Sequence, residues 1–465
     1  MYNQLLTMRL ILFSFFILLA GISVSCKKDK GFTKNHLDFS QDTLLFDTVF
    51  TTVGSVTKRF KIYNNNVSTI KIDEIQLMGG DDSPFRINFD GVPGIYHESI
   101  ELEGKDSLYG FVEVTLDVNG SSNPLVISDS IRFLTNGLNQ YLKLDVWGQD
   151  AYFHANELVG DHIELWQNDK PHVLYGQVAC GYPTLDSNRT LTIPAGTQIH
   201  GHKDAQLIVY KSAIDIQGEL GNEVVFQGDR LESFYDNVPG QWTGIRIIEA
   251  NTSSINYAVI KNSAVGLQVD STKSPVTLNL TNTIIDNSDF YNLLLVASPN
   301  VIVENCEFGK AGASSAFLFA GGTYNFKHCN FVNYWAGGRG GAAFKIQNWY
   351  TFENTTYVSS INSSRFDNCI FYGNAANEIE VDTLMGVEMD FQFNACLMKR
   401  EEIYEYPNYS SIIWNANPLF IDPSINDFHL DIGSPCRNAG DPAYSNSSDI
   451  EGVARATPNI GLYEL

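Results

Sequence analysis

The chain has 465 residues, of which 44% are hydrophobic and 12% aromatic, and its formal net charge at pH 7 is -23. This length and apolar content exclude a disordered chain and predict large buried cores in more than one domain. The acidic charge makes nucleic acids and anionic membrane surfaces unfavourable partners. No P-loop, dinucleotide-binding fingerprint, HExxH or EF-hand loop occurs, so no cofactor is expected.

Residues 1–26 have the layout of a secretory signal peptide. Arg9 precedes an apolar run from Leu10 to Ala20 that is too short to span a bilayer. The run is followed by SVSC, which resembles the lipobox of bacterial lipoproteins, with Ser23 where leucine is usual. The resemblance implies acylation of Cys26 and a membrane contact through that lipid anchor only. A plain secretory signal followed by a chance cysteine is the alternative.

Residues 27–150 show the alternation of half-buried antiparallel strands. Six segments carry it: TKRFKIYNNN, STIKIDEIQL, SPFRINF, YGFVEVTLDV, SDSIRFLTNG and QYLKLDVWGQ. Six or seven strands in about 120 residues predict an immunoglobulin-like β-sandwich. The order of the segments resembles the sandwich modules that precede larger domains in bacterial envelope proteins, which implies a spacer or an interaction module.

Residues 151–465 contain an internal repeat. Six segments align: NYAVIKN, NTIIDN, NCEFGK, HCNFVN, NCIFYGN and ACLMKR. One aligned column holds Ala258, Thr283, Cys306, Cys329, Cys369 and Cys396, with successive steps of 25, 23, 23, 40 and 27 residues. Strand alternation that recurs near every 23 residues, without a helical period, predicts a parallel β-helix in which equivalent residues of successive coils stack.

The cysteine column has three interpretations. Small apolar thiols suit an interior ladder, because free cysteine is among the most buried residue types. A disulfide between adjacent coils and a metal or catalytic site are the alternatives, and parallel side chains are poorly aimed for a disulfide. The ladder interpretation places the neighbouring His328 on the outside. Asparagines that follow the inward aromatics are expected at turns: Asn262, Asn287, Asn333 and Asn374.

Two further stretches carry a family resemblance. LTIPAGTQIHGHKDAQLIVYKSAIDIQG with VVFQGDR and PGQWTGIRI, and the final NPLFIDPSINDFHLDIGSPCRNAGD with NIGLYEL, resemble bacterial right-handed parallel β-helix proteins. These belong to the pectin-lyase-like superfamily, and the tail resembles the choice-of-anchor type found in Bacteroidota. The resemblance implies an all-β chain with a right-handed β-helix over residues 151–465. It also implies a lipoprotein of the cell envelope at the outer membrane, facing the periplasm or the cell surface, and leaves the activity open.

Charged residues of the predicted helix form one candidate site. Glu378, Glu380 and Asp382 alternate with apolar residues, which places three carboxylates on one solvent face, where they could act as acid and base or where Asp382 could contribute to a Ca²⁺ site. Arg365 and Asp367 lie on a flanking strand, and a groove could combine them with Lys345. Elimination at a uronic acid needs such a cation and base, whereas hydrolysis needs paired carboxylates. A solvated acidic face without a ligand is the alternative.

The 40-residue step between Cys329 and Cys369 forms a second candidate site. It accommodates one coil and an insertion that contains QNWYTFENTTY, and insertions at one position of a solenoid often mark its binding face. Trp349, Tyr350 and Phe352 could stack on sugar rings, and Asn348 could bind hydroxyls. A loop that folds its aromatics onto the helix and an irregular extra coil are the alternatives.

Three functions remain open from the sequence. The leading expectation is a cell-envelope lipoprotein that binds an extended polysaccharide or surface glycan, or acts as an adhesin, without catalysis. The alternative is a polysaccharide lyase or glycoside hydrolase of pectin-lyase-like type. A purely architectural envelope component is the third.

Overall fold

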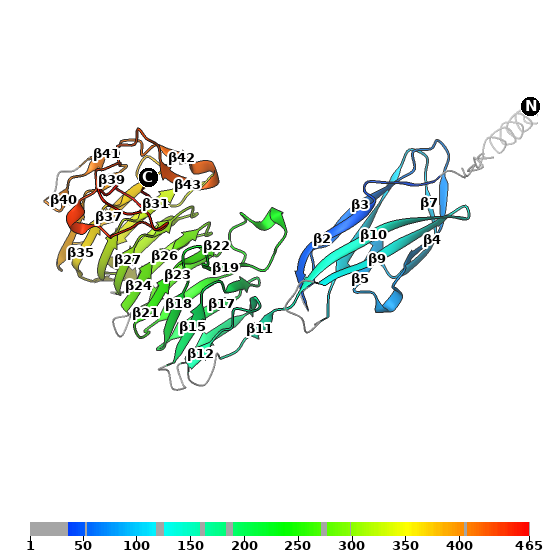
Figure 1. Ribbon diagram of the computed structural model, residues 1–465, viewed down its shortest axis with the longest axis horizontal. Coiled ribbons are helices and arrows are strands. Elements are labelled where there is room, and N and C mark those ends of the chain that lie inside the picture. The colour runs from blue at the N-terminus through cyan, green and yellow to red at the C-terminus, as the bar shows by residue number, and fades with distance from the viewer. Residues whose placement is uncertain are drawn as a thin grey trace, which may run out of the picture. The chain divides into compact units, whose positions relative to one another are not determined.

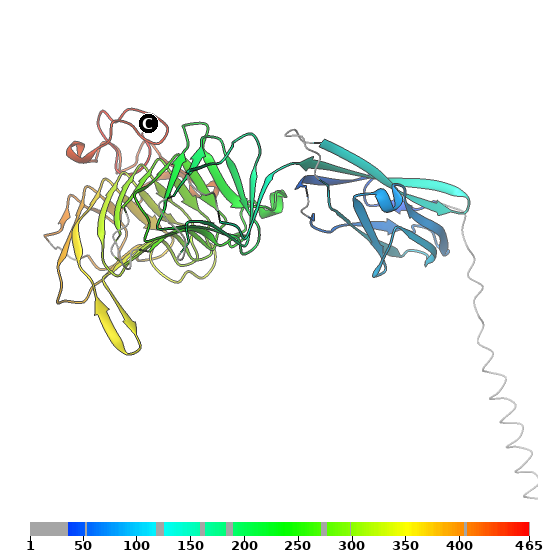
Figure 2. The ribbon, with the colours of Figure 1, turned by 90° about the horizontal axis from the view of Figure 1, so that it is seen from below.

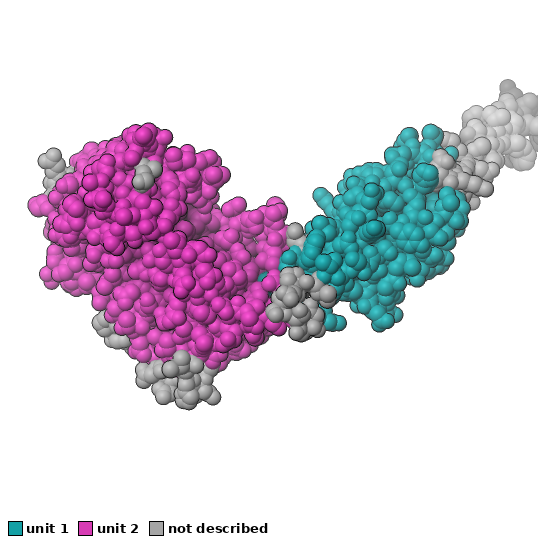
Figure 3. Space-filling view, viewed as in Figure 1, with its two compact units in different colours: residues 1–118, 125–148 teal, residues 119–124, 149–465 magenta. Residues whose placement is uncertain are grey.

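The chain is almost entirely β-structure, as predicted (Figure 1). The computed structural model describes residues 36–51, 54–117, 125–158, 163–182, 189–270, 277–297, 299–403 and 407–464. Two compact units, coloured separately in Figure 3, comprise residues 1–118 with 125–148 and residues 119–124 with 149–465. The predicted signal peptide and Cys26 lie outside the described residues. In the described ranges, no helix is long and apolar enough to cross a bilayer.

The first unit is an antiparallel sandwich of two five-stranded sheets, ordered β1-β3-β8-β5-β6 and β2-β10-β9-β4-β7. Its strands are β1 (Asp38–Phe39), β2 (Thr43–Phe50), β3 (Lys58–Tyr63), β4 (Ile70–Leu77), β5 (Phe85–Phe89), β6 (Val92–Pro93), β7 (Tyr96–Leu102), β8 (Ser107–Val114), β9 (Leu125–Thr135) and β10 (Leu138–Gln149). Inward Phe60, Phe89 and Phe133 meet edge to face at 6.0 to 6.3 Å. The sandwich is confirmed, with ten strands instead of six or seven. The six predicted segments omit β2, the two-residue strands β1 and β6, and β7, whose burial does not alternate.

The second unit contains three parallel sheets, which we call sheets I, II and III. Sheet I contains β11 (Tyr152–Ala155), β13 (His172–Tyr175), β16 (Gln198–Gly201), β19 (Val224–Gly228), β22 (Ala258–Lys261), β25 (Ile284–Asp286), β28 (Glu307–Phe308), β31 (Asn330–Asn333), β36 (Ile370–Gly373), β39 (Leu397–Met398) and β41 (Ile413–Trp414). Sheet II contains β12 (Ile163–Leu165), β15 (Thr190–Pro194), β18 (Ala213–Gln217), β21 (Ser253–Asn256), β24 (Thr277–Thr281), β27 (Asn300–Glu304), β30 (Thr323–Lys327), β35 (Ile361–Asp367), β38 (Met389–Asn394) and β40 (Tyr409–Ser410). Sheet III contains β14 (Gln177–Cys180), β17 (Gln206–Tyr210), β20 (Gly244–Ile248), β23 (Val265–Asp270), β26 (Tyr291–Val296), β29 (Ser314–Phe319), β32 (Phe344–Gln347) and β37 (Ile379–Asp382). From β13 to β38 each coil adds one strand to each sheet in turn, and the first and last coils contribute to sheets I and II only. This is the predicted parallel β-helix (Figure 1).

The cysteine column is an interior ladder, as predicted. Cys306, Cys329, Cys369 and Cys396 are fully buried free thiols next to the strands of sheet I. Burial raises the pKa of Cys306 and Cys369, so these thiols stay protonated. The aromatic column beside them is equally regular: Phe331 lies 5.1 Å from Phe308 and 4.9 Å from Phe371, with nearly parallel rings. These ladders fill the helix interior and leave no room there for a ligand.

The turn that precedes each of these cysteines has a left-handed backbone. Asn282, Asn305, His328, Asn368 and Ala395 have φ values between 48° and 57°. Asparagine tolerates this conformation better than most residues, and three of these five residues are asparagines. We call this row of turns between sheets II and I the left-handed ladder.

The predicted turn asparagines follow a different pattern. Asn262 and Asn287 are left-handed, and the Asn287 amide donates to the Asn262 side chain at 2.7 Å. Asn333 and Asn374 do not adopt this conformation. Asn374 still lies in a bend directly after β36, whereas Asn333 lies inside β31, so the prediction that these asparagines mark turns is wrong at Asn333.

Residues 417–464, which we call the tail, cover the outer face of sheet I. The tail includes β42 (Phe420–Asp422), β43 (Asp427–Leu430) and a separate apolar cluster that packs Ile460 and Leu462 against Val332 and Ile370 of the β-helix. It also covers the left-handed ladder: Gly461 donates its N–H to Asn368, whose side-chain oxygen accepts from the N–H of Asp441. The tail is therefore an integral part of the β-helix unit.

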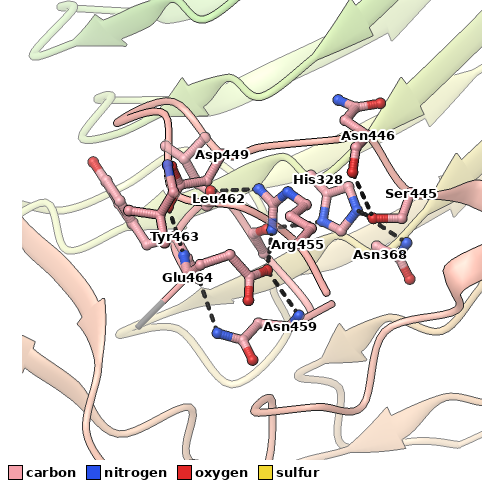
Figure 4. A network of polar contacts seen from close by, with 12 residues as sticks. His328, Asn368, Ser445, Asn446, Asp449, Arg455, Asn459, Leu462, Tyr463 and Glu464 are labelled. Atoms are coloured by element: carbon pink, nitrogen blue, oxygen red, sulfur yellow. Dashed lines mark hydrogen bonds and ion pairs between the residues drawn. The ribbon is translucent and has the colours of Figure 1, made fainter. Parts of the chain in front are cut away.

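His328 was expected outside the coil, and it does point away from the cysteines, but it is buried (Figure 4). Its Nδ1 donates to the carbonyl of Gly461 at 3.2 Å, and its Nε2 accepts from Ser445 at 3.0 Å and Asn368 at 3.2 Å. Burial, aided by the nearby Arg455, lowers its pKa to about 3. The neutral ring is a structural link between the tail and the coil.

Glu307 makes the stability of this interface pH-dependent. The side chain lies under the tail, where Tyr463 donates to it at 3.4 Å, and burial with the nearby Asp286 raises its pKa from 4.5 to about 8. A group whose folded pKa is raised contributes most below its unfolded pKa and loses that contribution as pH rises through the folded pKa.

We therefore expect the midpoint of guanidinium unfolding to fall as pH rises from 4.5 through 8. The Glu307→Gln variant, which stays neutral, should show a shallower fall in the same titration. Equal slopes for the two proteins would contradict this assignment.

Candidate functional site

A β-hairpin projects from the coils at the position of the predicted insertion. β33 (Trp349–Phe352) pairs with β34 (Thr355–Val358), and the two loop residues, Glu353 and Asn354, both have positive φ, as tight hairpin turns require. Sheet II continues directly from β30 to β35 across the 40-residue step, so the step is one coil plus this hairpin. Figure 2 shows the hairpin in yellow, projecting from the coil stack.

A row of aromatic rings connects the hairpin to the outer side of sheet III. Phe317 and Phe319 point outward from β29 because Ala316 and Leu318 fill the interior. Ring centroids follow one another at 5.7 Å (Tyr291 to Phe317), 5.2 Å (Phe317 to Phe319), 5.8 Å (Phe319 to Tyr350) and 5.0 Å (Tyr350 to Tyr357). We call these five residues the aromatic face.

Aliphatic side chains extend this surface along the coils. Leu294 and Val296 of β26 stand in register with Phe317 and Phe319 and are half-buried. Soluble proteins seldom leave contiguous apolar patches exposed without a function, and aromatic rings are suited to stacking on flat ligands. The aromatic face is therefore a candidate binding surface on the β-helix.

The predicted substrate-binding residues have different environments. Tyr350 belongs to the aromatic face, and Phe352 is 59% exposed near the hairpin loop. Trp349 is half-buried and donates its indole N–H to Asp382 at 3.1 Å, so this ring is held against β37. Asn348 was expected to bind hydroxyls, but it is fully buried and exchanges hydrogen bonds with the backbone of Leu384 at 2.8 and 3.0 Å.

Ion pairs border the aromatic face on both sides. Lys345 of β32 pairs with Glu380 of β37 at 2.8 Å, and its ammonium lies 5.5 Å from the ring centre of Phe317. On the other side, Arg246 of β20 pairs with Asp270 of β23 at 2.6 Å. Lys345 and Glu380 thus lie together as the sequence suggested, beside aromatic side chains.

The predicted row of three solvent-facing carboxylates is wrong at Glu378. Glu380 and Asp382 point outward from β37, but Glu378 precedes that strand and is fully buried. It pairs with Arg339 at 2.6 Å and accepts from the backbone N–H groups of Ala343 and Ala375. Burial raises its pKa while Arg339 and these hydrogen bonds oppose the shift. Glu378 therefore holds the preceding loop in place and does not share a solvent face with the other two carboxylates.

Arg365 and Asp367 lie on a different sheet from Lys345 and Glu380. They belong to β35 of sheet II and pair with each other at 2.8 Å, with Asp367 fully buried. The Arg365 guanidinium also lies 4.1 Å from the ring centre of Tyr444 in the tail. The predicted groove of five charged residues is therefore not formed, because its members are divided between two sheets and a buried loop.

A metal site finds no support in the described part of the chain, where no cluster of three or more His, Cys, Asp or Glu side chains could hold an ion. Asp382, the weak candidate ligand, accepts the hydrogen bond of Trp349. Acid–base chemistry needs a titratable pair that can reach a substrate. The predicted acid–base residues are buried or engaged in ion pairs.

Comparisons with known proteins do not identify a family. No protein-family model and no curated protein matches the chain. A family 123 glycoside hydrolase from Clostridium perfringens is 12% identical, with a TM-score of 0.18, over 27% of this chain and 26% of its own. An ASH / PapD-like domain of human CEP192 is 11% identical, with a TM-score of 0.18, over 28% of this chain and 95% of its own. The chain thus spans about a quarter of the hydrolase, and neither likeness bears on function.

Sequence reasoning missed four residues of the aromatic face: Tyr291, Phe317, Phe319 and Tyr357. The alternation in SSAFLF contains the signal, since inward Ala316 and Leu318 leave both phenylalanines outside. Their meeting with Tyr350 depends on the direction of the hairpin, which no periodicity specifies.

Proposed function

We propose that this protein is a cell-envelope lipoprotein that binds an extended glycan on the aromatic face of its β-helix. The observation that carries the proposal is the continuous row of five rings, from Tyr291 on sheet III to Tyr357 on the hairpin. Aromatic rings offer flat apolar contact to the CH faces of sugars, and a tyrosine hydroxyl can form a hydrogen bond to the same ligand. A row of rings that follows successive coils suits a polymer better than a small ligand.

The surroundings of the face support binding without catalysis. An enzyme that cleaves the polymer needs an acid and a base, or a base and a cation, at the bond that breaks. Beside the rings, Lys345 is paired with Glu380, and Asp382 accepts from Trp349. Because these charged groups already have partners in the protein, stacking on the rings is the main interaction that the face offers to a sugar.

Affinity electrophoresis of the purified chain through gels that contain a panel of polysaccharides tests the proposal. The variant Phe317→Ala should weaken binding of the polymer at least about fivefold, because the stacking of one flat ring on an aromatic side chain is worth about 1–3 kcal/mol. Phe234→Ala, which removes a 78% exposed ring elsewhere on the β-helix, serves as the matched control and should migrate like the parent. Loss of retention in both variants, or in neither, would contradict the assignment of the face.

The membrane anchor is proposed separately, on the lipobox-like SVSC that ends at Cys26. Cells that express the chain and are fed a labelled fatty acid should incorporate the label, and Cys26→Ala should abolish incorporation. A label that persists in this variant would place the acyl group elsewhere and remove the support for the anchor.

A further inference from the structure

The outward columns of sheet III combine uncharged side chains with paired charges. From β20 to β37, one column reads Arg246, Gln268, Leu294, Phe317, Lys345 and Glu380, and its neighbour reads Ile248, Asp270, Val296, Phe319, Gln347 and Asp382. The two cations of these columns are both paired with carboxylates of the same columns, at 2.6 and 2.8 Å. With two cations and three carboxylates, the columns carry a formal charge of -1.

This arrangement is unfavourable for an anionic polymer. To bind a uronate or a sulfate, Lys345 or Arg246 would have to leave a carboxylate partner, and the displaced Glu380 or Asp270 would then repel the ligand. The overall charge of -23 adds repulsion at longer range. An uncharged polymer meets neither penalty. It can stack on the rings and bind the amides of Gln268 and Gln347, each of which keeps an oxygen and a second N–H beside the hydrogen bond that it donates to Asp270 or to the carbonyl of Trp349.

We propose that the aromatic face selects uncharged polysaccharides over anionic ones, because its own cations are neutralised by carboxylates within the face. This inference rests on the proposed function and assigns the class of its ligand. The paired charges have a second effect. They hold Lys345 beside the Phe317 ring, at 5.5 Å from its centre, and so contribute to the shape of the surface.

The test uses pairs of polymers that share one backbone and differ in their carboxymethyl groups. Gels contain a neutral glucan, mannan or galactan, or the same polymer after carboxymethylation, and retention of the full chain is measured at about 0.15 M salt, where charges act over about 8 Å. We expect retention by at least one neutral polymer, and at least tenfold weaker retention by its carboxymethylated form. Equal or stronger retention by the carboxymethylated form would overturn the inference and leave the proposed function intact. Retention by no polymer, neutral or charged, would instead overturn the proposed function.

A double variant separates the local charges from the total charge. Asp270→Asn with Glu380→Gln frees Arg246 and Lys345, and should raise the ratio of anionic to neutral retention at least fivefold. The control, Asp81→Asn with Asp82→Asn, changes the net charge by the same amount at exposed positions of the sandwich and should leave the ratio unchanged. An equal rise in both double variants, or no rise in the first, would show that the ion pairs of the face do not set the selectivity.

Discussion

Replacing Arg455 with methionine should lower the free energy of unfolding of the β-helix unit by about 3–5 kcal/mol, since one partner of a buried ion pair is removed. The Arg455 side chain is fully buried and pairs with Glu464 through Nη1, while its Nη2 donates to the carbonyl of Leu462 at 2.6 Å and to the side-chain oxygen of Asn305 at 3.2 Å (Figure 4). The same Glu464 oxygen accepts from the N–H of Asn459 at 2.9 Å. Methionine would leave this carboxylate buried without its cation.

The loss should appear as a lower guanidinium midpoint with an unchanged slope, and as faster proteolysis within the tail. The double variant Arg455→Met with Glu464→Leu should recover part of it, because no buried charge then lacks a partner. Arg437→Met is the matched control: this arginine makes an exposed contact to Ile432, and its loss should fall within about 0.5 kcal/mol. A single variant as stable as this control would contradict the role of Arg455.

Replacing Phe331 with alanine should cost about 3–5 kcal/mol, as removal of a fully buried ring commonly does. Phe331 is fully buried between Phe308 and Phe371, and it meets Phe344 edge to face with ring centroids 5.0 Å apart. Adjacent coils hold their ladders rigidly, so the cavity cannot collapse without moving several strands.

Denaturant unfolding of the purified chain measures this effect, and Phe331→Leu should lose less than Phe331→Ala. Phe234→Ala provides the control, because its ring is 78% exposed and its removal opens no cavity. If the two alanine variants were equally stable, the interior ladder would not be the main source of the stability of the helix.

The sequence was sufficient to predict the ladders because they repeat. A buried residue followed two positions later by a large apolar side chain can be recognised in each copy, as cysteine and phenylalanine in three of the six. The long step before Cys369 indicated an insertion that the hairpin confirms. The contacts of the tail do not repeat: His328 meets Gly461, and Arg455 meets Asn305, across more than 130 residues. No local sequence pattern indicates contacts between residues so far apart in the chain, so the burial of His328 was not predicted.

In the candidate sites, strand alternation predicted some side-chain positions correctly and others wrongly. Alternation correctly placed Glu380 and Asp382 outside, but it failed at Glu378, which precedes β37 and turns toward Arg339 in an irregular loop. It also failed at Asn348, which stands between β32 and the hairpin, where strand periodicity no longer applies. Both of these errors concern residues just outside a strand.

Oxidative footprinting of the full chain, with and without the polysaccharide that retains it, tests the central proposal most directly. Hydroxyl radicals modify exposed aromatic and sulfur-containing side chains, so a bound polymer should protect Phe317, Phe319 and Tyr350. Phe234 and the 99% exposed Met385 should be modified equally in both samples. Protection of the aromatic face with these two controls unchanged is the predicted result. Unchanged modification of Phe317, Phe319 and Tyr350 under saturating polymer would contradict it.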